Sequence, residues 1–412
     1  MSYKEAKKKF ARIGIDTEKA IKDLGKIAIS MHCWQGDDVG GFESVGGASN
    51  GIQTTGNYPG KATTPEQLMA DIDFAMSLIP GRHRVNLHAC YGFHKDKIVD
   101  RDKLGPAQFA PWVVWAKKRG YGLDFNPTFF SHRNVVDGLT LSSPDPKIRK
   151  FWIDHGIRCL EIADYFAKEL KGTCSINFWC PDGYKDEPSD RLGPRQRMAD
   201  SLDRIFKRAK YDRKRVFPCF ESKLFGIGVE SYTVNSHEFV MGYAQSRKIL
   251  ALLDMGHFHI SENVADKISS FLMFFGKVAF HISRPVRWDS DHVIRQNDDL
   301  RAAAQEIVKM GPENFIIALD YFDASICRVA AWVLGMRNMQ KELLKAMLTP
   351  NAALKRLQDE GKFTAQLVLQ EEYKNYPVEE VWAEFCRRSG LSGDESWFAK
   401  VQKYEKDVLL KR

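Results

Sequence analysis

Residues 250–283 read LALLDMGHFHISENVADKISSFLMFFGKVAFHIS, and this stretch contains a complete strand–helix–strand unit. A short apolar run, Leu250–Asp254, precedes a helical pattern over Ser261–Phe275, and a second short run follows at Val278–Ser283. Both short runs are mostly apolar on both faces, which is typical of parallel strands buried between helices. The stretch therefore predicts two parallel strands joined by a helix.

The same alternation extends outward in both directions along the chain. Eight strand-like runs are present: Ile27–His32, Arg84–His88, Gly122–Asn126, Cys174–Trp179, Val216–Glu221, Leu250–Asp254, Val278–Ser283 and Phe315–Asp320. Helical patterns follow them at about 64–78, Pro106–Arg119, Pro146–Leu170, Pro194–Lys210, Ser236–Arg247, Ser261–Phe275, Asp298–Met310 and Ser325–Leu334. Eight strands that are each followed by a helix predict an α/β fold, the (β/α)8 TIM barrel.

Two parts of the chain lie outside the barrel pattern. Lys4–Leu24 reads as an N-terminal helix, and residues 336–412 are helical and amphipathic throughout. We therefore expect a barrel catalytic domain over 1–335, including the N-terminal helix, and a C-terminal helical extension over 336–412. The extension is expected to make subunit contacts, although covering the barrel's own outer helices would produce the same pattern.

The composition excludes several classes of protein. The net charge of +8 is modest for 412 residues, and basic and acidic residues are mixed, so no nucleic-acid partner is expected. No apolar run approaches the roughly 20 residues of a membrane span, so no membrane partner is expected either. The N-terminus lacks the apolar segment of a secretory signal, and the eight cysteines include no C-x-x-C pair. A cytoplasmic protein with reduced thiols is the expectation.

Polar side chains stand at the end of every predicted strand. They are His32 with Trp34, His88, Asp124 with Asn126, Trp179 with Asp182, Glu221 with Lys223, Asp254 with His257, His281 with Asp289 and Asp291, and Asp320. The C-terminal ends of barrel strands form the active site in this fold. Burying several carboxylates together costs several kcal/mol per ion unless something compensates. A divalent cation is the natural compensator, and a salt-bridge network with Lys223, Arg284 and Arg287 is the alternative.

The ionisable residues divide into two groups of ligands. One group comes from strand ends and would surround one ion: Glu221, Asp254, His281 and Asp320. The other lies in the loops above and would leave positions open for water and substrate: His257, Asp289 and Asp291. Carboxylates mixed with imidazoles suit Mn²⁺, Mg²⁺, Co²⁺ or Zn²⁺.

The Gly-rich segment 36–60 has neither phosphate-loop nor dinucleotide-site spacing and is expected to be a lid or a subunit-contact loop.

These residues stand in long stretches that resemble the L-rhamnose isomerase family, which are aldose–ketose isomerases on a xylose-isomerase-like barrel. The matching stretches run nearly end to end: His32–Asp38, Gly56–Lys61, Asn86–His88, Leu123–Pro127, Phe151–His155, Glu221–Gly228, Glu230–Thr233, Asp254–His259, Arg284–His292 and Leu319–Ser325. The segment between Glu43 and Gln53 departs from the family, so other aldoses with the same 2,3-configuration stay open as substrates.

The resemblance implies a homotetramer of barrels that converts the sugar L-rhamnose to L-rhamnulose. It places the structural metal on Glu221, Asp254, His281 and Asp320, and the catalytic metal on His257, Asp289 and Asp291. Mn²⁺ is the expected catalytic ion, with Co²⁺, Mg²⁺ or Zn²⁺ as alternatives, and a second divalent ion is expected at the structural site.

Isomerisation moves hydrogen between C1 and C2 of the open-chain sugar, either as a metal-assisted hydride shift or through an enediol with a protein base. Catalytic roles are expected for Lys223, His88 and Asp320. Substrate contacts are expected for Trp179, Trp34, Glu221, His257 and Asp289. The rival readings are a related metal-dependent barrel isomerase, epimerase or endonuclease, and a sugar-binding barrel that uses metal only for stability.

Overall fold

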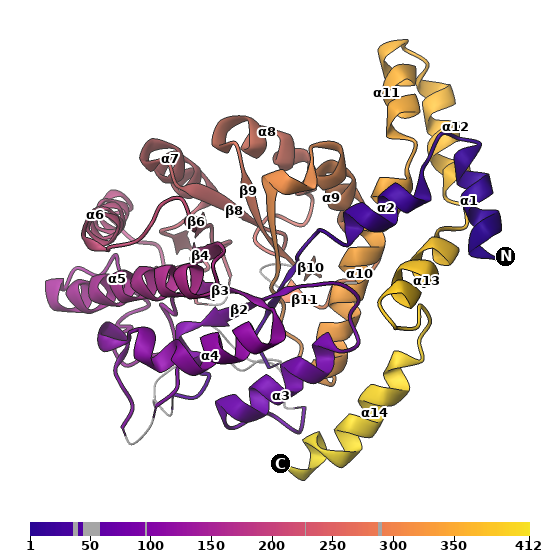
Figure 1. Cartoon of the computed structure of the whole chain (residues 1–412). Helices are drawn as coiled ribbons and strands as arrows, with labels where there is room; N and C mark the ends of the chain where they lie inside the picture. The colour runs from indigo at the N-terminus through magenta and orange to yellow at the C-terminus, as the bar shows by residue number, and fades with distance from the viewer. Residues whose placement is uncertain (36–39, 44–57, 95–96, 227, 287–290) are drawn as a thin grey trace.

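A closed barrel of eight parallel strands forms the centre of the computed structural model, which describes residues 1–35, 40–43, 58–94, 97–226, 228–286 and 291–412 (Figure 1). The barrel strands are β1 Ser30–His32, β2 Arg84–His88, β3 Gly122–Asn126, β4 Cys174–Phe178, β6 Val216–Glu221, β8 Leu250–Asp254, β9 Val278–Ile282 and β12 Phe315–Leu319. Their order around the barrel is β1-β12-β9-β8-β6-β4-β3-β2. The predicted TIM barrel is confirmed.

Helices cover the outside of the barrel (Figure 1). They are α3 Pro65–Met76, α4 Pro106–Arg119, α5 Pro146–Glu169, α6 Leu192–Arg208, α7 His237–Arg247, α8 Ala265–Phe275, α9 Asp298–Lys309 and α10 Arg328–Leu348. Local signals set their ends: Thr64 caps α3 by accepting from Gln67 N, and α4 ends at Gly120 in the left-handed conformation. The apolar side chains between sheet and helices form one continuous core.

Short elements shape the loops between strands and helices. Two antiparallel pairs are formed by β5 Gly183–Tyr184 with β7 Tyr232–Thr233, and by β10 Arg284–Pro285 with β11 Asp291–His292. The 3₁₀ turns are η1 Ala89–Tyr91, η2 Arg101–Lys103, η3 Pro312–Asn314 and η4 Leu409–Lys411. The β10–β11 pair matters most for function, because it carries Asp291 back toward the barrel mouth.

The N-terminal segment forms two helices where the sequence pattern predicted one. They are α1 Tyr3–Ala11 and α2 Thr17–Leu24. Gly14 between them adopts a positive φ of 78°, and the Asp16 carboxylate accepts from Glu18 N and Lys19 N to cap α2. A left-handed residue followed by a strong N-cap ends one helix and starts another, which the amphipathic pattern alone did not indicate.

The C-terminal extension packs along one side of the barrel with the N-terminal helices (Figure 1). Helix α10 does not stop at Leu334 as predicted but runs on to Leu348, and it contacts α2, α3 and α9. The remaining helices are α11 Asn351–Asp359, α12 Phe363–Tyr373, α13 Val378–Arg388 and α14 Trp397–Asp407. Within the described part of the chain, no helix combines the length and apolarity that a membrane crossing requires.

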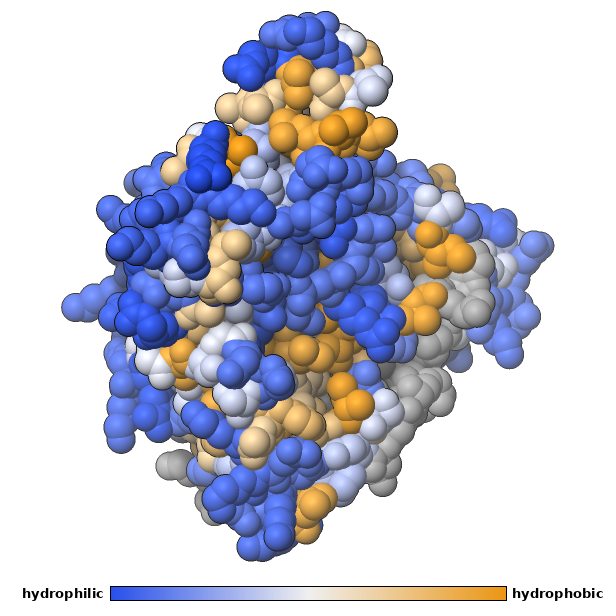
Figure 2. Space-filling model, turned by 90° about the vertical axis from the view of Figure 1, so that its right-hand side faces the viewer, coloured by the Kyte–Doolittle hydropathy of each residue, from blue (hydrophilic) through white to orange (hydrophobic). Residues whose placement is uncertain are grey.

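Helices α11 and α12 project from the body of the molecule (Figure 1). Figure 2 shows this projection at the top of the turned view, with apolar surface gathered at its base. Three large apolar side chains of α12, Phe363, Leu367 and Val368, are each more than half exposed.

Candidate metal centre and active site

Four strand ends bring three carboxylates and an imidazole together in the barrel mouth. β6 ends in Glu221 and β8 in Asp254, while β9 carries His281 and Asp320 directly follows β12. Asp254 and His281 are neighbours in the β8–β9 register. His281 Nδ1 lies 3.2 Å from Oε2 of Glu221, 3.2 Å from Oδ2 of Asp320 and 3.7 Å from Oδ2 of Asp254. The structure thus gathers all four residues that were predicted for the structural ion.

His257 joins this cluster from the loop that follows β8. Its Nδ1 lies 2.8 Å from Oε1 of Glu221, and its Nε2 lies 3.7 Å from Oδ2 of Asp291. The hydroxyl of Ser283 donates to Oδ1 of Asp291 at 2.9 Å. Two of the three residues predicted for the catalytic ion are therefore adjacent, and the third, Asp289, lies outside the described residues.

The approach of Asp291 to the β8 loop depends on a glycine. A Cβ atom placed on Gly256 would lie 1.8 Å from Oδ1 of Asp291. The backbone N–H of Gly256 also donates to Oδ1 of Asp254 at 2.7 Å. The Asp-x-Gly-His sequence therefore supplies two ligands and, between them, the only residue type that leaves room for a third.

Among the described residues, two overlapping groups have the spacing of a metal site. Within each group, one ligand atom per residue lies within 4.8 Å of the others. The groups are Glu221, Asp254 and His257, and Asp254, His281 and Asp320. Asp254 belongs to both, and Glu221 lies beside His257 as well as beside His281. The described members of the two predicted ligand sets therefore lie in one continuous cluster.

The electrostatics of this cluster show a shortage of positive charge. Burial would raise the pKa of Glu221, but His281 and His257 hold it well below its usual range. Burial and then the nearby Asp291 raise the pKa of Asp254 well above its ordinary value. Burial opposes the charging of His281, yet Glu221 and Asp320 raise the pKa of its imidazole well above its ordinary value. Protons on Asp254 and His281 thus supply the charge that a cation would bring.

The donor set fits a divalent metal ion. Asp254 Oδ2 and Asp320 Oδ1 are buried and have no hydrogen-bond partner among the described residues. Buried polar atoms in native proteins normally have a partner, so such oxygens point to a missing ligand. Carboxylate oxygens with two imidazoles are suitable ligands for Mn²⁺, Mg²⁺, Co²⁺ or Zn²⁺, which agrees with the prediction of a metal site.

Aromatic side chains line the barrel mouth beside the metal ligands. Trp179, which follows β4, stacks on His257 with ring centroids 5.9 Å apart and planes 16° apart. Phe130 lies 5.5 Å from Trp179 and 6.2 Å from both His88 and Trp34. Trp34 is buried and packs on the His88 ring at 4.0 Å. The geometry places Trp179 next to the ligands and Trp34 behind His88.

His88, at the end of β2, and Lys223, just after β6, also lie at this mouth. Neither ring nitrogen of His88 has a hydrogen-bond partner among the described residues, and burial lowers its pKa to about 3, so the ring is neutral. A neutral imidazole can both donate and accept a hydrogen bond. Lys223 Nζ lies 5.8 Å from the centroid of the Trp179 ring, and its backbone N–H donates to Asn235 O.

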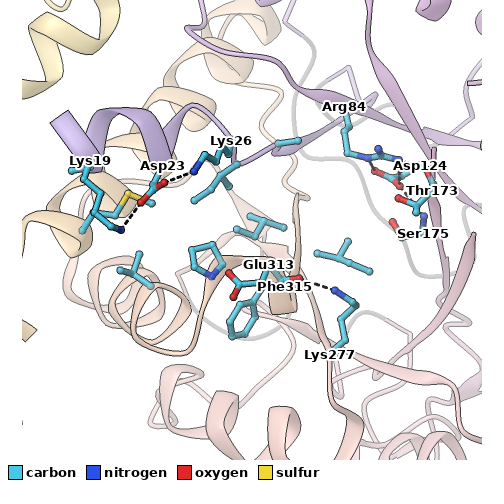
Figure 3. Close-up of a pocket in the computed structure, with 18 of the residues that line it drawn as sticks. Lys19, Asp23, Lys26, Arg84, Asp124, Thr173, Ser175, Lys277, Glu313 and Phe315 are labelled. Atoms are coloured by element: carbon cyan, nitrogen blue, oxygen red, sulfur yellow. Dashed lines mark hydrogen bonds and ion pairs between the residues drawn. The ribbon is translucent and has the colours of Figure 1, made fainter. Parts of the chain in front are cut away.

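Asp124 and Asp182, two of the strand-end residues of the sequence analysis, do not join the cluster. Asp124 faces the opposite end of the barrel, where it lies beside Arg84 (Figure 3). It accepts from Arg84 Nε and from Ser30 Oγ, both at 2.7 Å. It lines a cavity of about 900 Å³ at the N-terminal end of the strands. Asp182 accepts from the backbone N–H groups of Thr140 and Ser142 and from their hydroxyls.

Three residues of the site were not singled out in the sequence. The Asn177 amide donates to Oε2 of Glu221, Ser283 donates to Asp291, and Phe130 faces Trp179. Asn177 could have been found, because it lies two residues before Trp179 on an alternating strand pattern. Phe130 lies in a loop, where no periodicity indicates which way a side chain points.

Comparison with known proteins identifies the family of this chain. The model of the L-rhamnose isomerase (RhaA) family matches residues 1–412. The chain belongs to the L-rhamnose isomerase family. The L-rhamnose isomerase of Listeria innocua serovar 6a is 52% identical over 414 residues, covering all of this chain and 98% of that protein. That of Salmonella paratyphi A is 49% identical over 413 residues, with the same coverage.

Among solved structures, an L-ribulose 3-epimerase covers 83% of this chain and 98% of its own length, with 14% identity and a TM-score of 0.44. That likeness is too weak to bear on function. The family assignment confirms the resemblance found in the sequence and the prediction of an aldose–ketose isomerase.

Proposed function

We propose that this protein isomerises L-rhamnose to L-rhamnulose with the help of divalent metal. The observation that supports this proposal best is the pair of overlapping ligand groups at the barrel mouth. The L-rhamnose isomerase family model also matches the chain from end to end. Asp254 is common to both groups, so two ions could lie close together in one cavity. Paired metal sites suit a reaction in which two neighbouring oxygens of one substrate are held and polarised.

The proposed ligand sets follow the family pattern. Glu221, Asp254, His281 and Asp320 would hold the structural ion, and His257, Asp289 and Asp291 would hold the catalytic ion. A bound divalent cation would polarise the substrate carbonyl as a Lewis acid and lower the pKa of a bound water. Mn²⁺ is our first choice for the catalytic ion, because carboxylate and imidazole ligands with open positions suit it.

The chain's own residues would bind and orient the sugar. Trp179 offers an apolar face next to His257, and Trp34 supports His88 from behind. The neutral His88 ring, with both nitrogens available among the described residues, would hydrogen-bond O5 and assist ring opening. Lys223 would stabilise negative charge that develops on the sugar oxygens, and Asp320, at the edge of the cluster, would help to move protons between them.

The hydrogen that moves between C2 and C1 is proposed to pass directly between these carbons. L-Rhamnose labelled with deuterium at C2 should then give L-rhamnulose that retains the label at C1. NMR of the product in ordinary water measures the retention. Extensive loss of the label would replace the direct transfer by an enediol route with a protein base.

The test of the function is turnover of L-rhamnose by metal-stripped protein, with and without added Mn²⁺. Ketose is expected only when metal is restored. No ketose with Mn²⁺, Co²⁺, Mg²⁺ or Zn²⁺ would reject the proposal. A panel of other aldoses would then separate a related isomerase from an epimerase, which interconverts ketoses instead of forming them from aldoses.

The quaternary structure and location form the outer part of the proposal. We infer a homotetramer, supported by the exposed apolar side chains Phe363, Leu367 and Val368 on the projecting helix α12. An exposed apolar patch of this kind is typical of a protein interface. Light scattering measures the mass directly. The cytoplasmic location remains a prediction, as does the division into a barrel over 1–335 and an extension over 336–412.

A further inference from the structure

A buried ion pair joins two loops above the barrel mouth, outside the metal cluster. Arg101 lies in η2, in the connection between β2 and α4, and only 1% of its side chain is exposed. Its Nε donates to Oε2 of Glu43 at 2.8 Å, and a second guanidinium nitrogen lies 2.8 Å from the same oxygen. Glu43, in the loop after β1, is equally buried. The pair therefore ties the β1 and β2 loops together.

The same guanidinium also holds the loop after β3. One terminal nitrogen donates to the carbonyl oxygens of Thr128 and Phe130, and the other donates to Ser131 O at 3.2 Å. His155 of α5 reinforces the contact, because its Nδ1 donates to Arg101 O and its Nε2 accepts from Thr128 N, each at 3.1 Å. Three consecutive loops of the barrel mouth thus meet at one side chain.

The held loop carries an aromatic residue of the mouth. Phe130 packs 5.5 Å from Trp179 and 6.2 Å from His88 by ring centroids, and Trp179 stacks on the ligand His257. Arg101 binds the backbone of Phe130 and not its ring, so it sets where the ring enters the mouth. A lysine could keep the charge but could not reproduce the planar fork that bonds a carboxylate and several carbonyls at once.

We infer that Arg101 is a positioning residue that determines sugar affinity through Phe130, without contacting either the sugar or the metal ligands. The inference rests on the proposed isomerase function for its kinetic arm. The Arg101–Glu43 pair thereby gains a role in sugar binding, which is separate from holding the metal ligands. Weakening the Arg101–Glu43 ion pair should displace the Phe130 ring, while the metal ligands at the ends of β6, β8, β9 and β12 keep their places.

A matched control lies at the other end of the barrel. Arg84 also bonds a buried carboxylate, that of Asp124 (Figure 3). It donates as well to two backbone carbonyls, those of Leu123 and Thr173. Arg84→Lys therefore loses the same kind of fork but far from the mouth. Any loss of stability that is general to such a change appears in both variants, and an effect on sugar binding appears only in Arg101→Lys.

The kinetic arm uses full-length Mn²⁺-loaded protein. Arg101→Lys should raise KM for L-rhamnose about tenfold, equivalent to about 1.4 kcal/mol, with kcat nearly unchanged and the same content of bound Mn²⁺. Phe130→Leu should raise KM similarly, and the double variant should show no further rise, because both changes act through one wall. An equal KM in Arg101→Lys and Arg84→Lys, or additive effects in the double variant, would overturn the inference.

A second arm does not depend on the substrate. The Thr128 amide, which donates to His155, should exchange with deuterium about tenfold faster in Arg101→Lys than in the wild type, and unchanged in Arg84→Lys. Exchange at the wild-type rate in Arg101→Lys would show that Arg101 does not hold the loop after β3. A wild type inactive on L-rhamnose would reject the proposed function alone, while the exchange result still decides whether Arg101 positions this loop.

Discussion

The two ends of the barrel use the same residue types in opposite ways. At the N-terminal end, the Asp124 carboxylate accepts bonds from Arg84, Ser30 Oγ and Ser175 N, so both charges of the Arg84–Asp124 pair have a partner. Burial would raise the pKa of Asp124, but Arg84 holds it below its usual value. This buried ion pair is balanced without any ligand.

At the C-terminal end, buried carboxylate oxygens lack such partners among the described residues. Asp254 Oδ2 and Asp320 Oδ1 have no hydrogen-bond partner among the described residues, and the pKa of Asp254 is raised by burial and by Asp291. A buried aspartate that is paired with arginine stabilises the fold. A buried aspartate whose pKa is raised because it lacks such a partner is a candidate metal ligand. The bonding partners of the buried carboxylates, and not the residue type, therefore distinguish the stabilising end from the functional end.

Asp254→Asn should have the largest effect on activity. Asp254 belongs to both ligand groups, so its loss should lower kcat about 1,000-fold, the scale of several kcal/mol expected when metal-assisted charge stabilisation is removed. The metal-free variant should unfold at the same or a higher temperature than the metal-free wild type, because burial disfavours the charged form of Asp254 and the amide cannot take up that charge. Turnover assays and calorimetry with and without Mn²⁺ measure both effects. Normal activity would remove Asp254 from the ligand set.

Gly256→Ala should have the next largest effect on turnover. The added methyl group would lie 1.8 Å from Oδ1 of Asp291, so Asp291 or the His257 loop must move. A displacement of about 1 Å at reacting groups can cost about 100-fold in rate, and we expect a loss of kcat of that order. Gly242→Ala in α7 is the control, because an added methyl group there would have no atom within 4 Å and activity should not change. Equal activity in the two variants would show that this close approach is not needed.

Metal removal should expose the charge imbalance as a dependence on pH. Because the pKa values of Asp254 and His281 are raised in the folded metal-free protein, their stabilising contributions are present at low pH and are lost as pH rises through those values. A bound cation replaces those protons, so the increase in Tm on adding Mn²⁺ should be greater at about pH 8 than at about pH 6. Thermal scans at both values test this. A gain in Tm independent of pH would mean that the metal displaces no protons.

The strands and their polar ends could be predicted because the barrel imposes a simple pattern. Short runs apolar on both faces marked all eight strands, and the ligands Asp254 and His281 came with them as the last inward residues. Depth along a strand was harder to predict. Asp124 and Asn126 share one face by the two-residue period, yet one lies at each end of the barrel's interior, and the pattern does not say which partner each meets.

Contacts made by loops and between distant segments could not be predicted. The Phe130 wall depends on Arg101, which lies 29 residues earlier in the chain and reaches it only in the folded state. The extension of α10 past Leu334 likewise depends on packing against α2, α3 and α9, which supports a helix beyond its local signals. Tertiary contacts of this kind override local propensity.

The smallest effect on activity is expected for Asp124→Asn, which is the same substitution as Asp254→Asn made at the other end of the barrel. It leaves the Arg84 guanidinium without its carboxylate, and breaking a buried pair in this way should lower the free energy of unfolding by about 3 kcal/mol. Urea unfolding measures that loss, and kcat/KM at about 25 °C should match the wild type, because the residue lies away from the mouth. A marked loss of activity in the folded variant would mean that the two ends are coupled through the barrel interior. Unchanged activity with reduced stability, beside the opposite outcome for Asp254→Asn, would establish that one end of the barrel holds the fold and the other performs the chemistry.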